Sequence, residues 1–285
     1  MAGSRTSKRE RSKNPSRIIL QQRDKDIVSA LYEYRFLSRE QIQRLFDFNC
    51  TTKANLRLRK LYDHYYVSRY FIPTSRGSSK AIYSLGKKAI DIVTECLGVD
   101  PQGVRSAQKE ISEFKELFLN HQLNLNDIRI TFSKSITDHP DMRLERWIAD
   151  HQCKQEYTVT SPGPKKNKTF RPDGYFMFWH RKQLYSYFIE LDQSTMSHRR
   201  FLAKTSDYLE YARSGAYQRN FGVKYFRVLV VTLSAQRLLN LKKSVEMQTK
   251  KIFWFSTLTK LLNDGVFGPA WLRGGHKGIH RLIEE

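Results

Sequence analysis

The segment YFRVLVVTL, residues 225–233, is a continuous apolar run with the length of a single strand. Such a run is typical of a strand that is buried on both faces of a sheet. A helical pattern, AQRLLNLKKSVEMQ, follows it, and a second strand-like segment, KIFWFSTL, comes next. Strand, helix and strand at this spacing indicate a crossover connection. We therefore predict a mixed sheet with helices on its faces in the C-terminal part of the chain.

The net charge restricts the partners of the chain. Its 285 residues include 50 Lys and Arg against 28 Asp and Glu, a net charge of +22, and 40% of them are hydrophobic, enough to form a core. This excess favours a polyanion, and we predict double-stranded DNA rather than an anionic membrane surface. No signal peptide or bilayer-spanning segment is present in the sequence, so we expect a cytoplasmic protein.

The cysteines and histidines do not form a recognisable metal motif. Cys50, Cys96 and Cys153 lie far apart and no CxxC pair occurs, which disfavours a disulfide framework or a zinc ribbon. His276 and His280 lie four residues apart in GGHKGIH, but the glycines disfavour a helix there. We expect no cofactor on these grounds.

Composition divides the chain into a tail and two domains. Residues 1–23 mix Lys and Arg with Ser, Gly and Pro, which predicts a disordered basic tail that either lies along phosphates or only solubilises the terminus. Residues 24–98 change from helical to strand-like spacing. The segment GVDPQGVRS is a break, and residues 105–285 form the second domain.

The first domain has the pattern of a winged helix-turn-helix. Ile27, Leu31 and Tyr34 form one apolar helical face. Ser38 opens a second short helix through Phe46, and Thr51 or Thr52 caps a third. The segment VSRYFIPTSRGSSKAIYSL then predicts two strands around a basic turn, a wing, and GKKAIDIVTECL predicts a closing helix.

The third helix separates an apolar side from a cationic side. Its predicted buried stripe consists of Ala54, Leu58, Leu61 and Tyr65. The opposite side is expected to meet the major groove of DNA, with one apolar residue for a thymine methyl, and the wing is expected to contact the DNA backbone. The predicted DNA-binding residues are Thr52, Lys53, Leu56, Arg59 and Lys60 of the helix, and Arg76 and Lys80 of the wing. The alternative is a protein-interaction or dimerisation module.

The second domain opens with a predicted long helix whose apolar face is Ile111, Phe114, Phe118, His121, Leu125 and Ile128. A hairpin follows in RPDGYFMFWHRKQLYSYFIELDQST, residues 171–195. A turn within HRKQ places Asp173 opposite Glu190, and Arg171 opposite Asp192. Two facing carboxylates require a cation between them, either a divalent metal or a Lys or Arg, and an Arg171–Asp192 ion pair favours the metal-free alternative.

The hairpin resembles the PD-(D/E)XK nuclease core, in which Asp and Glu on adjacent strands bind magnesium and a nearby Lys polarises water. Pro172, Asp173 and Glu190 match, but Asp192 stands where that pattern has Lys. Lys204, which shares a helical face with Tyr208 and Tyr211 in FLAKTSDYLEYA, is the candidate replacement.

The order of segments over nearly all of the chain beyond the tail resembles the replication-relaxation family of plasmids and integrative elements. The segments are FLSREQIQRLF, LRLRKLYDHYYV, RPDGYF, FIELDQST, KTSDYLEYA, RVLVVTLSAQR and IFWFSTLTKLL. The resemblance implies a winged helix joined to a restriction-endonuclease-like domain. It also implies an altered acidic site at Asp173, Glu190 and Asp192, with Lys204 as its base.

Two main functions follow from these patterns. The first is a DNA-binding accessory or initiator protein of plasmid replication or conjugative transfer, which positions a relaxase, replication protein or other DNA-processing protein and could act as a homodimer. The alternative is a metal-dependent DNA endonuclease or nickase that uses Asp173, Glu190, Asp192 and Lys204, with Mg²⁺ or Mn²⁺ held by Asp173 and Glu190. The altered Lys position favours the first. A transcription regulator is a third alternative that shares the winged helix.

Overall fold

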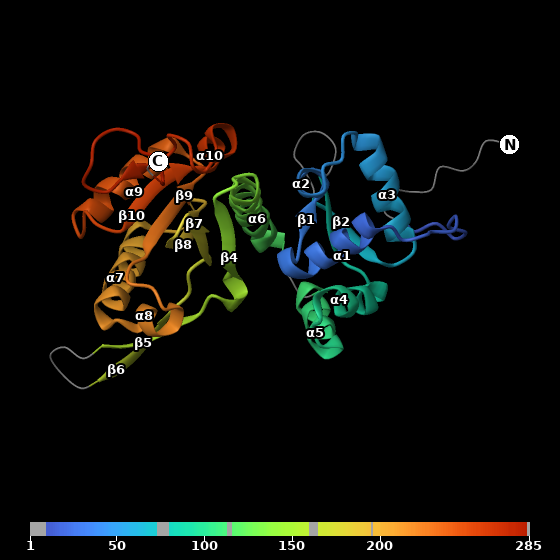
Figure 1. Cartoon of the computed structure of the whole chain (residues 1–285), viewed down its shortest axis with the longest axis horizontal. Coiled ribbons are helices and arrows are strands. Elements are labelled where there is room, and N and C mark those ends of the chain that lie inside the picture. The colour runs from blue at the N-terminus through green and yellow to red at the C-terminus, as the bar shows by residue number, and fades with distance from the viewer. Residues whose placement is uncertain (1–9, 73–79, 113–115, 160–164, 195, 284–285) are drawn as a thin grey trace. The chain divides into compact units, whose positions relative to one another are not determined.

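The computed structural model describes residues 10–72, 80–112, 116–159, 165–194 and 196–283 (Figure 1). Two compact units make up the chain, Met1–Ile130 and Thr131–Glu285, and the division falls within one helix, α6 (Glu116–Thr137). The domain boundaries predicted from composition, at residues 23, 98 and 105, stay a prediction. Among the described residues, no helix combines the length and apolarity needed to cross a bilayer.

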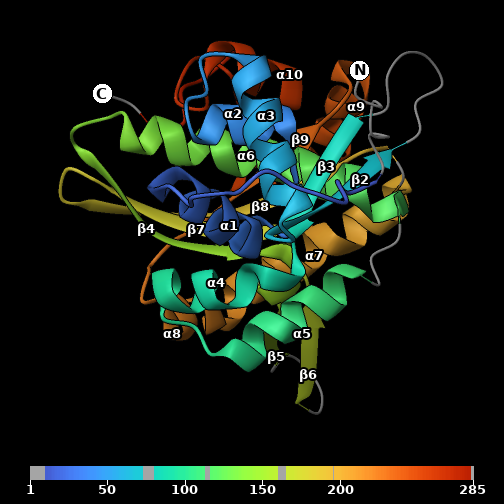
Figure 2. The same ribbon diagram turned by 90° about the vertical axis from the view of Figure 1, so that its right-hand side faces the viewer.

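The first unit is a winged helix-turn-helix followed by further helices. Its three-stranded antiparallel sheet has the order β1-β3-β2, and Figure 2 shows α3 beside the β2–β3 hairpin. The elements are α1 (Gln22–Tyr34), β1 (Leu37–Ser38), α2 (Arg39–Leu45), α3 (Thr51–Asp63), β2 (Val67–Ile72), β3 (Lys80–Leu85), a 3-10 turn (Lys87–Ala89), α4 (Ile90–Leu97), α5 (Pro101–Ser112) and the first part of α6.

Local hydrogen bonds explain where the short helices begin. The Ser38 hydroxyl accepts from the Gln41 backbone N–H at 3.2 Å, and the Gln41 side chain accepts from the Ser38 N–H at 2.9 Å. This reciprocal cap starts α2 at the position that the sequence predicts. The predicted cap of α3 is wrong, because Cys50 is the N-cap residue and Thr51 is already helical.

The core side of α3 differs from the predicted stripe at one position. Ala54, Leu58 and Leu61 are fully buried as predicted, but Tyr65 is 43% exposed. The helix ends at Asp63, and Tyr65 adopts a positive φ of 68°, so the helical spacing no longer applies there. Tyr62 takes the buried place instead.

The predicted long helix of the second domain includes the end of α5, most of α6 and residues 113–115, which lie outside the described part of the chain. The predicted break contains the start of α5 at Pro101. Proline fits the first turn of a helix because its missing N–H has no partner there in any case. Phe114 lies outside the described residues. The predicted apolar face is also partly wrong, since Phe118 is exposed and His121 is half-buried.

Polar side chains of α6 are buried in place of Phe118. The Asn126 amide donates to the carbonyl oxygens of Tyr34 and Phe36, at 3.1 and 2.6 Å, and the Gln41 side chain donates to the Leu123 carbonyl at 2.7 Å. The two Asn126 bonds satisfy carbonyl groups at and just after the end of α1, and the Gln41 bond ties α2 to α6. They account for the inclusion of α6 up to Ile130 in the first unit.

The second unit is built on a six-stranded mixed sheet with the order β11-β10-β9-β8-β7-β4. Strands β8, β9 and β10 run parallel and their neighbours run antiparallel. The sheet strands are β4 (Met142–Ala149), β7 (Gly174–His180), β8 (Gln183–Asp192), β9 (Arg227–Thr232), β10 (Phe253–Thr257) and β11 (Leu272–Arg273). The other elements are the 3-10 turn Asp150–Gln152, the hairpin of β5 (Gln155–Val159) and β6 (Lys166–Phe170), α7 (His198–Ser214), α8 (Ala216–Phe221), α9 (Ala235–Glu246) and α10 (Leu258–Asp264).

The sheet has the connections that the sequence predicts. Helix α7 joins β8 to the parallel strand β9, and α9 joins β9 to the parallel strand β10. The β7–β8 hairpin also has the predicted register, since Gly174 pairs with Ile189 and His180 with Gln183. The backbone N–H of Asp173, the residue before β7, donates to the carbonyl of Ile189, the partner of Gly174, at 3.1 Å.

Aromatic side chains fill both faces of this sheet. On the face covered by α7, the Phe188 and Tyr208 ring centroids are 5.6 Å apart. On the other face, Phe132 from the end of α6 lies 4.6 Å from Phe176, and Trp271 is fully buried. Burial on both faces explains why β9 reads as a continuous apolar run.

Candidate nucleic-acid interface and acidic cluster

Helix α3 exposes four of the five side chains predicted to contact DNA. Thr52, Lys53, Leu56 and Lys60 are exposed, and Leu56 has 62% of its surface accessible. Arg59 is half-buried, and its guanidinium donates to Asp63 at 2.7 Å and to the Glu10 carbonyl at 3.0 Å. The outer face of α3 therefore offers two lysines, a hydroxyl and an apolar side chain.

A groove of about 620 Å³ lies between α3 and the β2–β3 hairpin. Three arginines and a lysine contribute to its lining together with apolar and polar groups. The lining residues are Arg39, Glu40, Thr52, Asn55, Leu56, Arg59, Arg69, Phe71, Lys80, Ala81 and Tyr83. Sequence reasoning found Lys80 of the wing but missed Arg39, Asn55 and Arg69, which come from three elements. Arg76 lies outside the described residues.

The segment before α1 lies along α3. The Arg11 guanidinium stacks over the rings of Tyr62 and Tyr65, 3.9 and 4.3 Å from their centroids. The Ser12 N–H donates to the Asp63 carboxylate at 2.9 Å. Residues 10–21, part of the predicted disordered tail, thus have a defined path in the structure, because aromatic faces and a carboxylate on α3 bind them.

A buried ion pair fixes α3 to α1. Asp24 is fully buried, and the Nε of Arg57 donates to its Oδ1 at 2.6 Å, with a second bond from Arg57 Nη2 to the other oxygen. The same carboxylate accepts from the Gln21 N–H at 2.7 Å and so caps α1. This hydrogen bonding with Asp24 raises the pKa of Arg57 above its ordinary value. The pair holds the cationic helix against its scaffold.

Glu190 is the centre of the predicted acidic site. Its side chain is 4% exposed, and its two oxygens accept from Lys204 Nζ and the Tyr208 hydroxyl, each at 2.5 Å. Asp173, whose charge also acts on Glu190, accepts from the Leu191 N–H of β8 at 2.8 Å. The structure thus brings together Asp173, Glu190 and Lys204, and the cation beside the facing carboxylates is the ammonium of Lys204.

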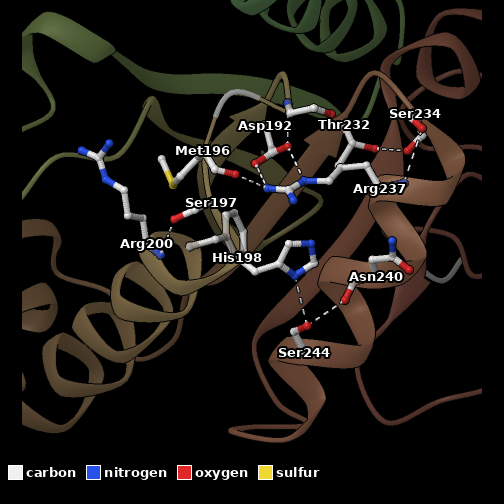
Figure 3. A network of polar contacts seen from close by, with 12 residues as sticks. Asp192, Met196, Ser197, His198, Arg200, Thr232, Ser234, Arg237, Asn240 and Ser244 are labelled. Carbon is white, nitrogen blue, oxygen red and sulfur yellow. Dashed lines mark hydrogen bonds and ion pairs between the residues drawn. The ribbon is translucent and has the colours of Figure 1, made fainter.

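Asp192 has a different partner from the predicted one. Its carboxylate receives two parallel hydrogen bonds of 2.9 Å from the guanidinium of Arg237 on α9 (Figure 3). The same guanidinium donates to the Met196 carbonyl at 2.6 Å. The predicted Arg171–Asp192 pair is wrong: Arg171 is exposed, and the side chain of Asp192 is 2% exposed beneath α9.

Burial dominates the electrostatics of the cluster. It raises the pKa of Glu190 to about 7, although the Lys204 ammonium acts in the opposite direction. Burial lowers the pKa of Lys204, but the charges of Glu190 and Asp173 outweigh it and raise that pKa above its ordinary value. Lys204 therefore keeps its ammonium charge at neutral pH, while burial opposes the ionisation of Glu190.

Carboxylates of this kind are magnesium ligands in proteins. Here both oxygens of Glu190 accept hydrogen bonds from α7, and Asp192 is bound by α9. A divalent ion at Glu190 would have to displace the ammonium of Lys204. As arranged, Glu190 and Asp192 fasten two helices to the sheet, and both carboxylates are buried.

These observations define a protein with two units: a winged helix-turn-helix with a cationic outer face, and a mixed α/β sheet with a buried acidic cluster. The chain belongs to the replication-relaxation family, whose model matches residues 28–225, more than half of its length. The family gives it a DNA-related role.

Two similar solved structures are mutants of Lactococcus lactis ZitR. One carries a single cysteine-to-serine substitution and is 15% identical to this chain; the other has a cysteine and a histidine replaced by alanine and is 14% identical. The matches cover 44% and 42% of this chain, 79% and 75% of those chains, with a TM-score of 0.24 in both cases. No curated protein matches the chain.

Proposed function

We propose that the protein is a DNA-binding accessory or initiator protein of plasmid replication or conjugative transfer. The observation on which this rests is the outer face of α3, where Thr52, Lys53, Leu56 and Lys60 are exposed next to a basic groove. A net charge of +22 supports a polyanionic partner.

In this proposal α3 enters the major groove of duplex DNA. Leu56 meets a thymine methyl, and Lys53 and Lys60 approach phosphates on either side. Lys80, with Arg39 and Arg69 in the adjoining groove, lies where the sugar–phosphate backbone would pass. These contacts position the protein on the duplex, and Thr52, Asn55 and Leu56 are the side chains that could identify bases.

The second unit acts without cutting DNA in this proposal. We infer a nuclease-like layout from the positions of three residues: Asp173 directly precedes β7, Glu190 lies on the adjacent strand β8, and Lys204 lies on the following helix. The buried state of Glu190 and Asp192, with side chains 4% and 2% exposed, supports a non-catalytic role. The unit would instead supply a surface for a relaxase, replication protein or other DNA-processing protein.

The double variant Lys53→Ala with Lys60→Ala tests the DNA interface. Binding to duplex DNA from the encoding element, followed by fluorescence anisotropy over a series of salt concentrations, is expected to weaken. The slope of log affinity against log salt should become shallower by about one to two units, because two phosphate contacts are lost. Arg59 is left intact because Asp63 binds it.

The matched control is Lys243→Ala with Lys250→Ala, which removes the same charge from exposed positions of the second unit. An equal loss of slope in both double variants would show that only total charge matters and would remove α3 from the interface. A footprint on the encoding element then separates an origin of replication or transfer from a promoter, which would indicate a transcription regulator.

One observation favours a metal-dependent endonuclease as a second candidate. The ammonium of Lys204 lies 2.5 Å from Glu190 and within the influence of the Asp173 charge, as a replacement base would. Supercoiled plasmid is incubated with the protein and Mg²⁺ or Mn²⁺, beside Asp173→Ala and Lys204→Ala. Cleavage by the wild type that both variants lack would establish this activity and displace the non-catalytic proposal.

A further inference from the structure

A cluster of two histidines and an aspartate lies at one edge of the sheet in the second unit. His139 and Asp141 belong to the turn between α6 and β4, and His180 is the last residue of β7. Antiparallel pairing of Met142 with His180 brings the two segments together. One potential ligand atom from each of the three side chains lies within 4.8 Å of the others.

We propose that His139, Asp141 and His180 form a binding site for a divalent transition-metal ion of the zinc type. Two imidazoles and one carboxylate are a ligand set that Zn²⁺, Co²⁺ and Ni²⁺ accept, whereas Mg²⁺ and Ca²⁺ prefer oxygen ligands alone. Three protein ligands leave a coordination position open for water or for a group from a partner.

Backbone hydrogen bonds hold the three residues in place. The Met142 N–H donates to the His139 carbonyl at 3.1 Å, and the Arg181 N–H donates to the Asp141 carbonyl at 2.9 Å. The Asp141 N–H donates to Nδ1 of His139 at 3.3 Å. This hydrogen bond is long, and a metal ligand bond to Nδ1 would replace it.

The surroundings allow the ligands to bind. The rings of His139 and His180 lie edge to face with centroids 5.5 Å apart. His180 is buried, His139 is half-buried and Asp141 is exposed, so an ion can approach from the side of Asp141. The Asp141 carboxylate lies 3.8 Å from Nε of Arg181, and more than half of each side chain is exposed. That weak pair does not prevent Asp141 from turning to a metal ion.

This site is separate from the acidic cluster. Asp173 precedes β7 and His180 ends it, so the two sites lie about 20 Å apart along an extended strand. A metal ion would join the α6–β4 turn to the β7–β8 hairpin. The proposal is therefore independent of whether the second unit cuts DNA.

The test is a titration of the full chain, stripped with a chelator, with ZnCl₂ by isothermal calorimetry and with CoCl₂ by visible absorption. We expect one binding site whose affinity falls by at least about 100-fold in His139→Asn and in Asp141→Asn. Both residues lie on the turn and not in the core, so their variants keep the fold, which circular dichroism checks.

The matched control is His276→Asn with His280→Asn, a second pair of histidines with ring centroids 5.8 Å apart. This variant should keep the wild-type affinity and Co²⁺ spectrum. Wild-type affinity in His139→Asn, Asp141→Asn and His180→Asn would overturn the proposal. So would loss of the site in the control pair alone, or the lack of any Zn²⁺ binding by the wild type.

Discussion

Lys204 determines what the facing carboxylates of the hairpin can do. Its ammonium contacts Glu190 from α7 while Asp173 lies across the strand pair. A buried carboxylate without a cation would carry the full cost of desolvation. The pair therefore lets Glu190 remain in the core. The pKa of Glu190 is nevertheless raised to about 7, because burial still disfavours its ionised form.

The free energy of unfolding should therefore depend on pH through the ionisation of Glu190. The folded-state pKa of Glu190, about 7, lies above its ordinary value of 4.5. Its protonated form thus stabilises the fold below pH 4.5, and that contribution is lost as the pH rises to about 7, a change on the order of 3 kcal/mol. We expect Glu190→Gln to remove this part of the pH dependence in urea unfolding.

The control for this measurement is Glu156→Gln on β5. The hydrogen bond with Lys154 lowers the pKa of Glu156, so its effect lies below pH 4.5. An unchanged slope between pH 4.5 and 7 in Glu190→Gln would contradict the assignment.

The Asp24–Arg57 pair makes a second prediction for single residues. Arg57→Ala leaves the fully buried Asp24 without its counter-charge. We expect the free energy of unfolding to fall by about 3 kcal/mol or more, because an unpaired buried charge is strongly destabilising. Chemical denaturation measures the loss. Lys53→Ala, an exposed change on the same helix, should alter stability by less than about 0.5 kcal/mol; a similar small change in Arg57→Ala would refute the role of the pair.

Among the elements, α6 depends on polar contacts rather than on an apolar stripe. Asn126 donates to two carbonyl oxygens at the end of α1. Asn126→Ala removes both of these buried hydrogen bonds, and we expect a loss of about 2 kcal/mol of stability. Amide exchange in α1 should also become faster. Asn124→Ala, at a half-buried position of the same helix, is the control, and an equal effect of both changes would show that only helix propensity is involved.

Local signals in the sequence predicted most elements. The Ser38 cap, the strands of the wing, the apolar run of β9 and the register of the β7–β8 hairpin follow from spacing within a few residues. Tyr65 was misplaced because the helix ends before it. Phe118 was misplaced because α6 packs against the end of α1 through polar groups such as Asn126, which periodicity cannot reveal.

The candidate site was predicted less completely, because several of its contacts join residues that are distant in the sequence. Asp173 and Glu190 share a hairpin, so their pairing could be deduced, and Lys204 follows on the next helix. Arg237, the partner of Asp192, is 45 residues away in the sequence. Arg39 and Arg69 line the groove between α3 and the β2–β3 hairpin, and they come from different elements. Contacts of this kind depend on the tertiary fold and leave no local pattern.

For the whole molecule, the proposed division of labour predicts that DNA affinity is independent of the acidic cluster. The cluster is buried in the second unit, and the α3 face belongs to the first. We expect Lys204→Ala to keep duplex affinity within about twofold of the wild type, even where its stability falls. Anisotropy at a temperature at which the variant is folded measures this. A tenfold loss would place the cluster in the DNA-binding machinery.

Asp24 has two structural roles, and these should restrict which residues occupy its position in relatives of this protein. The same carboxylate caps α1 and neutralises Arg57. Loss of either charge alone leaves the other residue without its counter-charge. Substitutions at positions 24 and 57 should therefore co-vary among homologues. Exchange of the two charges is disfavoured, because a cation at position 24 would oppose the helix dipole; paired neutral or paired apolar replacements are the expected outcome.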